Sequence, residues 1–299
     1  MSEYPNDLSA LVEDYLERLR FTDAESTREL AEAMRYSLLA GGKRIRPVLT
    51  LATARATGIE PERLLPSAAA IELIHTYSLI HDDLPAMDDD ELRRGRPTSH
   101  VVYGENVAIL AGDGLFAEAL GLIARRQEGP PERVLAAMDE LLGATGVDGM
   151  VGGQYVDVTA PEVPSGGAAG HPMDAAGLRA LHALKTGRLI AASVGVALVL
   201  AGLDERAAEP YRRFAAELGV LFQIVDDILD VTESDEVLGK PSGSDERHHK
   251  LTYVSLFGLD RARELAAESH AKTREALAGA GGQTDDLARI ADFIHTRHT

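Results

Sequence analysis

Two clusters of aspartates follow apolar runs in this sequence and are the residues most suited to chemistry. The first cluster is Asp82, Asp83 and Asp88 in LIHDDLPAMDDDEL, and the second is Asp226, Asp227 and Asp230 in LFQIVDDILD. At about 100° per residue, Asp226 and Asp230 share a helical face one turn apart. Like charges in apolar surroundings are destabilising unless a cation neutralises them. Mg²⁺ is the expected cation, since it prefers oxygen ligands and shares its coordination with phosphates.

The first cluster has a less regular spacing than the second. On an ideal helix Asp82 and Asp88 would point about 240° apart. Pro85 lies between them and interrupts the helix, so we expect the later aspartates to turn back toward Asp82. An isolated acidic run is typical of a solvated helix end, but two clusters in apolar helices favour a diphosphate held between metal-binding carboxylates.

Basic residues that could bind a diphosphate occur in a few places. Gly41 and Gly42 precede Lys43, Arg44 and Arg46, so that the backbone can approach an anion and the guanidinium groups can bind phosphate oxygens in pairs. Further basic residues come later in the chain, namely Arg93, Arg94, Arg96, Lys185, Arg188, Lys240 and Lys250. Each one taken alone is typical of surface charge.

Composition limits the classes of function. The chain has 299 residues with a formal net charge of -18, which argues against nucleic-acid or anionic-membrane partners because those recruit Lys and Arg. It has no cysteine, which excludes disulfides and thiolate metal sites. The N-terminus is acidic and lacks the features of a targeting segment, so we expect a cytoplasmic protein. The longest uncharged apolar stretch, 189–203, is too short to span a membrane and predicts a buried core helix.

Apolar residues recur three and four positions apart through most of the chain, as in LSALVEDYLERL and RRFAAELGVLFQIVDDILDV. Alternation typical of strands is absent from the sequence, so an all-α fold is predicted. Residues 161–172 form a linker-like segment, and 234–250 form a second long loop. Because chemistry-bearing residues lie on both sides of 161–172, we expect a single domain over 1–299 built as one helical bundle.

Seven motifs in colinear order resemble the trans-polyprenyl diphosphate synthases, in particular bacterial farnesyl and short-chain geranylgeranyl diphosphate synthases. The motifs are GGKRIRP, IELIHTYSLIHDDLPAMDDDELRRGRPT, GGQYVDV, LKTGRLI, FQIVDDILD, LGKPSGSD and KLTY. The match runs from about Leu38 to Tyr253 and is highly specific, since all seven must coincide. The resemblance implies an all-helical bundle around a deep central cavity, and a homodimer.

The resemblance also implies roles for individual residues. Three Mg²⁺ ions would be bound by Asp82, Asp83, Asp88, Asp226, Asp227 and Asp230. The residues implied in catalysis are Asp82, Asp83, Asp88, Lys185 and Asp226. An allylic diphosphate would contact Arg93, Lys185, Thr186, Gln223, Lys240 and, from a closing loop, Lys250. Isopentenyl diphosphate would contact Lys43, Arg46, His75 and Arg94.

Three further residues need separate interpretation. A lone histidine such as His75 on an apolar helix is more often a core residue, but its place in the motif favours substrate contact. Gln154 and Asp157 in GGQYVDV are three residues apart and share a helical face, so they are expected to support the site.

The implied reaction is Mg²⁺-assisted ionisation of dimethylallyl or geranyl diphosphate and attack by the double bond of isopentenyl diphosphate. Tyr77 and Ser78 lie about one turn before Asp82, where a tyrosine can form a floor under the growing chain. Similar enzymes with an aromatic residue there make the fifteen-carbon farnesyl diphosphate, which is the product we predict. Geranylgeranyl diphosphate is the first alternative.

Two other classes of protein also carry part of this pattern. A terpene cyclase shares an aspartate motif and Mg²⁺, but it needs no isopentenyl diphosphate site such as GGKRIRP with His75. A catalytically silent partner subunit is expected to lack one aspartate cluster, and both clusters are intact here. The synthase remains the preferred interpretation.

Overall fold

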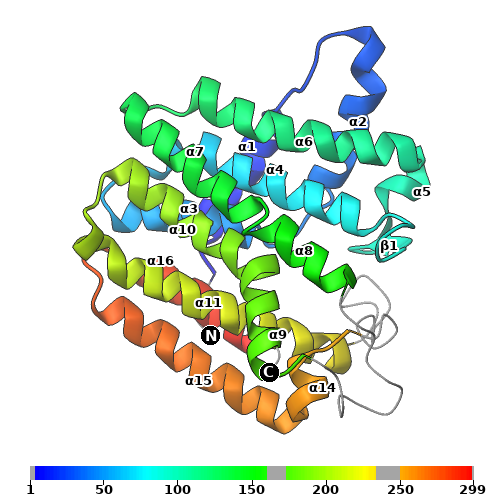
Figure 1. Ribbon diagram of the computed structural model, residues 1–299. Coiled ribbons are helices and arrows are strands. Elements are labelled where there is room, and N and C mark those ends of the chain that lie inside the picture. Colours follow the sequence, from blue (N-terminus) through cyan, green and yellow to red (C-terminus); the bar gives the residue numbers. More distant parts are fainter. Residues whose placement is uncertain (1–3, 160–172, 234–249, 298–299) are drawn as a thin grey trace.

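A computed structural model describes residues 4–159, 173–233 and 250–297 of the chain. Helices dominate it, which confirms the all-α prediction (Figure 1). The helices are α1 Asn6–Arg18, η1 Glu25–Thr27, α2 Arg28–Leu38, α3 Ile45–Ala56, η2 Pro61–Leu64, α4 Leu65–Asp82, α5 Ser99–Tyr103, α6 Glu105–Arg126, α7 Pro131–Thr145, α8 Met150–Thr159, α9 Ala175–His182, η3 Ala183–Gly187, α10 Arg188–Ala201, α11 Glu205–Thr232, α14 Tyr253–Phe257, α15 Leu259–Ala278 and α16 Asp285–Thr296. The strands are β1 Leu92–Arg93 and β2 Arg96–Pro97.

The helices pack in a bundle with α4, α3 and α10 in its interior (Figure 1). Helix α4 packs against α6 and α3, while α10 packs against α7, α3 and α11. Helix α15 covers the other side of α11. These contacts bring α4 and α11, the two helices that carry aspartate clusters, to opposite sides of one interior space.

Helix α10 explains the long apolar stretch in the sequence. Its side chains between Leu189 and Leu200 are almost all buried, so the stretch is a core helix as predicted. Two segments, Glu105–Arg126 and Ala175–Ala201, are long and apolar enough to cross a membrane by length and composition. Core helices of globular proteins meet the same criterion, and the packing of α10 accounts for the second segment.

A short hairpin, which the sequence pattern did not indicate, interrupts the helices in the described part of the chain. Strands β1 and β2 pair antiparallel, with Arg93 opposite Arg96. The two turn residues, Arg94 and Gly95, have φ values of 54° and 72°. Consecutive positive φ values fit the right-handed twist of a two-residue hairpin. Because of this turn, the neighbouring side chains of Arg93 and Arg94 point in different directions.

Candidate active site

A cavity of about 570 Å³ lies between α3, α4, α8, η3 and α11, within the usual size range for small-molecule sites. Fourteen of the residues expected at the site line it: Arg46, His75, Tyr77, Ser78, Asp82, Asp88, Arg93, Arg94, Lys185, Thr186, Gln223, Asp226, Asp227 and Lys250. Lys43, Asp83 and Asp230 do not line it. Lys240 is outside the described residues. Residues that precede 160–172 in the sequence and residues that follow it both line the cavity.

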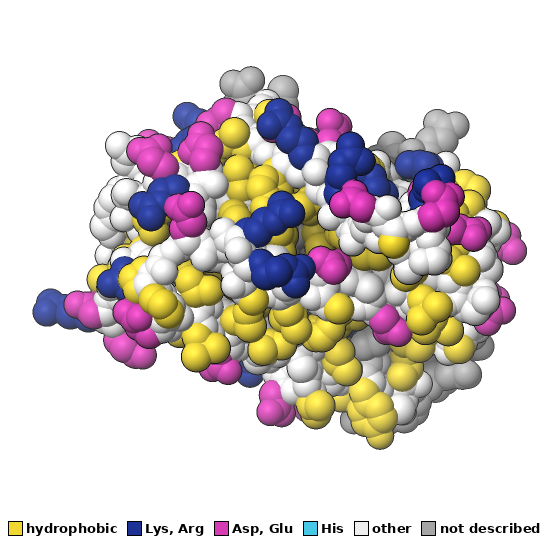
Figure 2. Space-filling model, turned by 90° about the horizontal axis from the view of Figure 1, so that it is seen from above, with side chains coloured by type: hydrophobic (Ala, Val, Ile, Leu, Met, Phe, Trp, Pro, Cys, Tyr) yellow, Lys and Arg dark blue, Asp and Glu magenta, His cyan; other side chains and the backbone are white. Residues whose placement is uncertain are grey.

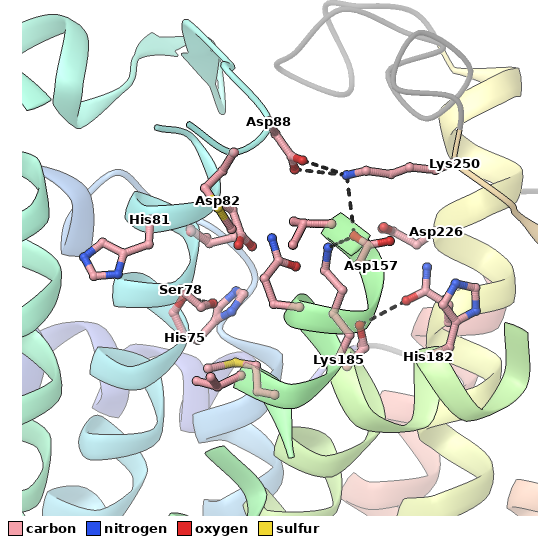
Figure 3. Close-up of a pocket in the computed structure, with 18 of the residues that line it drawn as sticks. His75, Ser78, His81, Asp82, Asp88, Asp157, His182, Lys185, Asp226 and Lys250 are labelled. Carbon is pink, nitrogen blue, oxygen red and sulfur yellow. Dashed lines mark hydrogen bonds and ion pairs between the residues drawn. The ribbon is translucent and has the colours of Figure 1, made fainter. Parts of the chain in front are cut away.

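The chain folds back after α4, as expected from Pro85. Helix α4 ends at Asp82, and the backbone N–H of Asp88 donates to the carbonyl of Asp82 at 2.9 Å. Asp89 has a φ of 52°, which completes the reversal. The side chains of Asp82 and Asp88 therefore both reach the cavity (Figure 3).

Asp83 points away from its neighbour Asp82. Its carboxylate accepts hydrogen bonds from Nε of Arg93 at 2.8 and 2.9 Å and from Nη2 at 2.5 Å. Asp90 lies 3.7 Å from the same guanidinium. In this state Asp83 binds and orients Arg93, so its expected metal contact remains a prediction.

The aspartates of the second cluster also point in different directions. Asp226 is exposed to the cavity. Asp227 is buried, where it accepts hydrogen bonds from Nε2 of Gln223 at 2.8 Å and from the backbone N–H of Tyr253 at 2.7 Å. Asp230 is buried outside the cavity lining. The helical face shared by Asp226 and Asp230 thus extends beyond the cavity.

The carboxyl group of Asp82 is placed where a cation would stabilise its charge. Burial raises its pKa to about 6, a net value to which the charge of Asp88 adds and which Lys185 opposes. A carboxylate in this position gains most from a divalent cation. Among residues 4–159, 173–233 and 250–297, no three His, Asp or Glu side chains form a complete metal site. Mg²⁺ takes few protein carboxylates and fills the rest of its coordination with phosphate and water, so the carboxylates of Asp82 and Asp88 at this cavity would fit it.

Two lysines already contact carboxylates in this part of the cavity. Nζ of Lys185 lies 2.5 Å from Asp157, and Nζ of Lys250 lies 3.0 Å from Asp88 and 3.8 Å from Asp157 (Figure 3). Asp157, expected only to support the site, therefore holds both lysines. We call Asp82, Asp88, Asp157, Lys185 and Lys250 the aspartate–lysine region.

A turn of π-helix carries Lys185 into the cavity. Such turns are rare and occur mostly at functional sites. Helix α8 approaches this turn closely, since a Cβ on Gly153 would lie 2.4 Å from the backbone nitrogen of Lys185. Thr186 donates its hydroxyl to Oε1 of Gln223 at 3.0 Å. Gln223 thereby connects the π-helical turn to Asp227.

A second basic group lies beside α4. Nη1 of Arg46 is 3.4 Å from Nε2 of His75, and Arg94 donates to the carbonyl of Gly41. Burial lowers the pKa of Arg46 to about 10. Burial also lowers the pKa of His75 well below its usual value, and the charges of Arg46 and Arg94 lower it further. We call Arg46, His75 and Arg94 the arginine–histidine region.

Arg44 and Lys43 do not join this region. The guanidinium of Arg44 is buried and lies 2.7 Å from both Glu13 and Glu72, so it anchors the loop to α1 and α4. Lys43 is exposed, and its Nζ lies 5.6 Å from the ring centroid of Phe293. The alternating directions of Lys43, Arg44 and Arg46 follow from the positive φ of 50° at Arg44.

Aromatic side chains gather below Asp82. The ring of Tyr77 meets Phe116 edge-on at 5.4 Å and His81 edge-on at 5.7 Å. His81 fits there only because residue 112 is glycine, since a Cβ would lie 2.1 Å from its ring. Tyr77 is thus braced from α6 and occupies the position expected for a floor. Ser78 also lines the cavity and donates its hydroxyl to the carbonyl of His75 at 2.9 Å.

Sequence analysis did not identify several residues around the cavity. Among them are Phe116, which packs against Tyr77 from α6, and His182 and Phe222, which line the cavity. Burial lowers the pKa of His182 to about 4. The ring centroid of Phe222 lies 5.6 Å from the guanidinium of Arg46 and 5.9 Å from that of Arg297. Helical spacing from Lys185 and from Asp226 could have indicated the last two, but neither residue type is distinctive by itself.

The model of the polyprenyl synthetase family matches residues 27–293 of the chain. The chain belongs to the polyprenyl synthetase family. A farnesyl diphosphate synthase from Geobacillus stearothermophilus is 42% identical over 99% of this chain and 96% of its own length. A chloroplastic geranylgeranyl pyrophosphate synthase from Capsicum annuum is 46% identical over 89% of this chain and 71% of its own length.

A solved structure of the same family agrees with the fold. The geranyltransferase from Helicobacter pylori, complexed with magnesium and isoprenyl diphosphate, superimposes with a TM-score of 0.83 at 31% identity. The superposition covers 98% of this chain and 97% of that one. The family model together with the farnesyl and geranylgeranyl diphosphate synthase relatives supports short-chain prenyltransferase activity. It also agrees with the resemblance inferred from the seven motifs.

Proposed function

We propose that the protein condenses isopentenyl diphosphate with dimethylallyl and geranyl diphosphate to give farnesyl diphosphate. The observation that carries the proposal is one cavity with two separate groups of cations. The aspartate–lysine region suits an allylic diphosphate with Mg²⁺, and the arginine–histidine region suits the diphosphate of isopentenyl diphosphate. A cyclase that uses a single diphosphate substrate has no need for the second group.

Mg²⁺ would be held by Asp82, Asp88 and Asp226, which face the cavity, and by Asp227 if it exchanges its present hydrogen-bond partners for the metal. Asp83 and Asp230, which do not line the cavity, would join them if their side chains turn on binding. Three ions are the number we propose. Their charge would neutralise the diphosphate and favour its departure. Magnesium in the related Helicobacter pylori geranyltransferase supports this choice of metal.

The side chains of the chain itself position the leaving group. Lys185 and Lys250 contact the phosphate oxygens once a diphosphate replaces their present carboxylate partners, with Arg93 and Thr186 beside them. Gln223 keeps Thr186 in place and is a second proposed contact. The allylic C–O bond then breaks, and its electron pair leaves with the diphosphate. Lys240 is a further proposed contact outside the described residues.

Isopentenyl diphosphate would be bound by Arg46, Arg94 and His75, whose imidazole is neutral before the diphosphate binds, with Lys43 at the rim. Its double bond supplies the electron pair for the new carbon–carbon bond to the allylic cation. The proton lost from the adjacent carbon passes to the released diphosphate. The protein therefore needs to hold two substrates and exclude water, and it needs no side-chain base.

Product length is the finer part of the proposal. The braced ring of Tyr77 below Asp82 supports a fifteen-carbon product, with Ser78 beside it leaving room for the chain. Geranylgeranyl diphosphate stays the alternative, since relatives carry both names. The test incubates the protein with Mg²⁺, geranyl diphosphate and labelled isopentenyl diphosphate and sizes the products. A fifteen-carbon product that becomes longer in Tyr77→Ala is expected, while no incorporation of label would reject the synthase.

We also propose that residues 1–299 form a single domain and that two copies form a homodimer. Large apolar side chains are exposed on α5, α6 and α7 (Figure 2): Val101, Val102, Ile109, Leu110, Leu135 and Leu142. Side chains of this kind on adjoining helices are typical of an interface. Sedimentation of the wild type and of Leu135→Glu tests the proposal, since the substitution is expected to shift the protein toward the monomer.

The cytoplasm is the proposed location, without insertion into a membrane and without a nucleic-acid partner. The net charge of -18 supports this, because neither an anionic membrane nor a nucleic acid would attract an acidic protein. Cell fractionation followed by a salt wash checks this. Retention in the membrane fraction after the wash would contradict it.

A further inference from the structure

Gln154 lines the cavity from α8 with a side chain that has no hydrogen-bond partner. Both Nε2 and Oε1 are buried, and neither bonds to any of the residues that the structure describes. A buried carboxamide without a partner destabilises a folded protein. Another glutamine, Gln127, shows the usual arrangement: it accepts from Ser67 at 2.6 Å and donates to two carbonyls at 3.0 Å. Because the residue lines the cavity, its carboxamide is placed to bond a group that enters there once the atoms that now cover it move aside.

The position of Gln154 along α8 indicates which part of a substrate it meets. Asp157 is three residues later on the same face and contacts Lys185, which marks the level of the diphosphate. Gln154 lies about 4.5 Å farther from that level along the helix axis. Met150 and Val151 come one turn before it and line the cavity with apolar atoms. The carboxamide thus sits where the phosphate-binding end of the cavity gives way to its hydrocarbon-binding part.

We propose that Gln154 is a catalytic residue that stabilises the allylic cation, an inference that rests on the proposed function. When the allylic C–O bond breaks, its electron pair leaves with the diphosphate and positive charge spreads over C1 and C3. The Oε1 atom of Gln154 presents the negative end of its dipole to that charge, and Nε2 donates to the departing diphosphate. Gln154 itself gains and loses neither proton nor electron pair.

A neutral amide suits this place better than a carboxylate does. A fixed dipole in a buried, water-poor site stabilises developing charge without reorganising. A carboxylate would repel the diphosphate and could capture the cation as an ester. The unpartnered carboxamide destabilises the free protein, and this cost is offset only when charge develops in the transition state. An interaction that is stronger in the transition state than in the bound substrate speeds the reaction.

The test compares Gln154→Leu with Gln127→Leu, the same change at a partnered glutamine. For Gln154→Leu we expect the single-turnover rate with geranyl diphosphate to fall about 10- to 100-fold. The KM values for both substrates and the affinity for inorganic diphosphate with Mg²⁺ should stay within about threefold. Its melting temperature in the absence of substrates should stay equal or rise, because an unpartnered polar group is removed. Gln127→Leu should melt at lower temperature and keep its rate.

Three outcomes separate the explanations. An unchanged rate in Gln154→Leu, with an active wild type, overturns this inference alone. A rate that falls together with the melting temperature and the affinity for inorganic diphosphate assigns Gln154 a structural role and also overturns it. A wild type that forms no product from either allylic diphosphate rejects the proposed function, and the role of Gln154 falls with it. Gln154→Glu is expected to raise the KM for the allylic substrate, since its charge opposes the diphosphate.

Discussion

The two regions of the cavity balance their charges in different ways. In the aspartate–lysine region each lysine contacts a carboxylate, with Lys185 on Asp157 and Lys250 on Asp88. In the arginine–histidine region neither Arg46 nor Arg94 forms an ion pair with any described residue, and burial lowers the pKa of both. The first region needs added cations before it attracts an anion. The arginine–histidine region has excess positive charge without any added metal. The two substrates should therefore differ in their need for metal, and isopentenyl diphosphate should need it less.

The largest effect is expected from Asp82→Asn, which keeps the shape of the side chain and removes its charge. We expect kcat to fall about 10³-fold, because the substitution removes a carboxylate that would hold Mg²⁺ against the leaving group. Incorporation of labelled isopentenyl diphosphate measures kcat. Binding of isopentenyl diphosphate, measured by calorimetry, should stay the same. A parallel loss of that binding would contradict the separation of the two regions.

Removal of metal makes the same comparison without a mutation. With EDTA present, we expect the affinity for geranyl diphosphate to fall at least about 100-fold, while that for isopentenyl diphosphate changes less than about threefold. Calorimetry with each substrate alone gives both numbers. Equal losses for the two substrates would mean that metal also serves the arginine–histidine region. Restoring Mg²⁺ is the control.

Arg46→Leu should affect the second region selectively. Loss of a buried guanidinium that contacts a diphosphate is expected to raise the KM for isopentenyl diphosphate about 30- to 100-fold, with the KM for geranyl diphosphate nearly unchanged. Initial rates at varied concentrations of each substrate provide the measurement. Arg188→Leu, an exposed position on the neighbouring helix α10, is the matched control. A rise in both KM values would argue against two separate sites.

A smaller effect is expected from proton uptake by His75. Its pKa is well below the usual value in the free protein, since burial and the charges of Arg46, Arg94, Arg93 and Arg44 all lower it. A bound diphosphate favours the charged imidazole and raises that pKa. At pH values between the free and the bound pKa, binding therefore takes up as much as about one proton, and it strengthens as pH falls through that range. Calorimetry in buffers of different ionisation enthalpy counts the protons. His75→Gln should abolish the uptake, and an unchanged count would contradict it.

Much of this arrangement could be predicted from the sequence because it depends on local pattern. Helical spacing predicted the bundle, and Pro85 predicted the reversal that joins Asp82 to Asp88. The different directions of Asp82 and Asp83 could not be predicted, because Arg93 captures Asp83 through a hairpin ten residues later. The contact of Asp157 with Lys185 depends on a π-helical turn that has no clear sequence signal.

The GGKRIRP motif illustrates the same limit. Its basic residues predicted anion binding, but their spacing gave no reason to separate Arg44 from Arg46. The positive φ at Arg44 turns that side chain into an acidic pair of α1 and α4, while Arg46 enters the cavity. Burial partners distant in sequence therefore decide which of several similar cations reaches the cavity.

The turn between β1 and β2 sets the spacing of the side chains of Arg93 and Arg94. Arg93 contacts Asp83 on one side, and Arg94 contacts the carbonyl of Gly41 on the other, although only one peptide unit, about 3.8 Å, separates their Cα atoms. In the proposed function each of the two guanidinium groups would contact a different diphosphate. We therefore expect an insertion in this two-residue turn to change the spacing of the two substrates while leaving the groups that bind them in place.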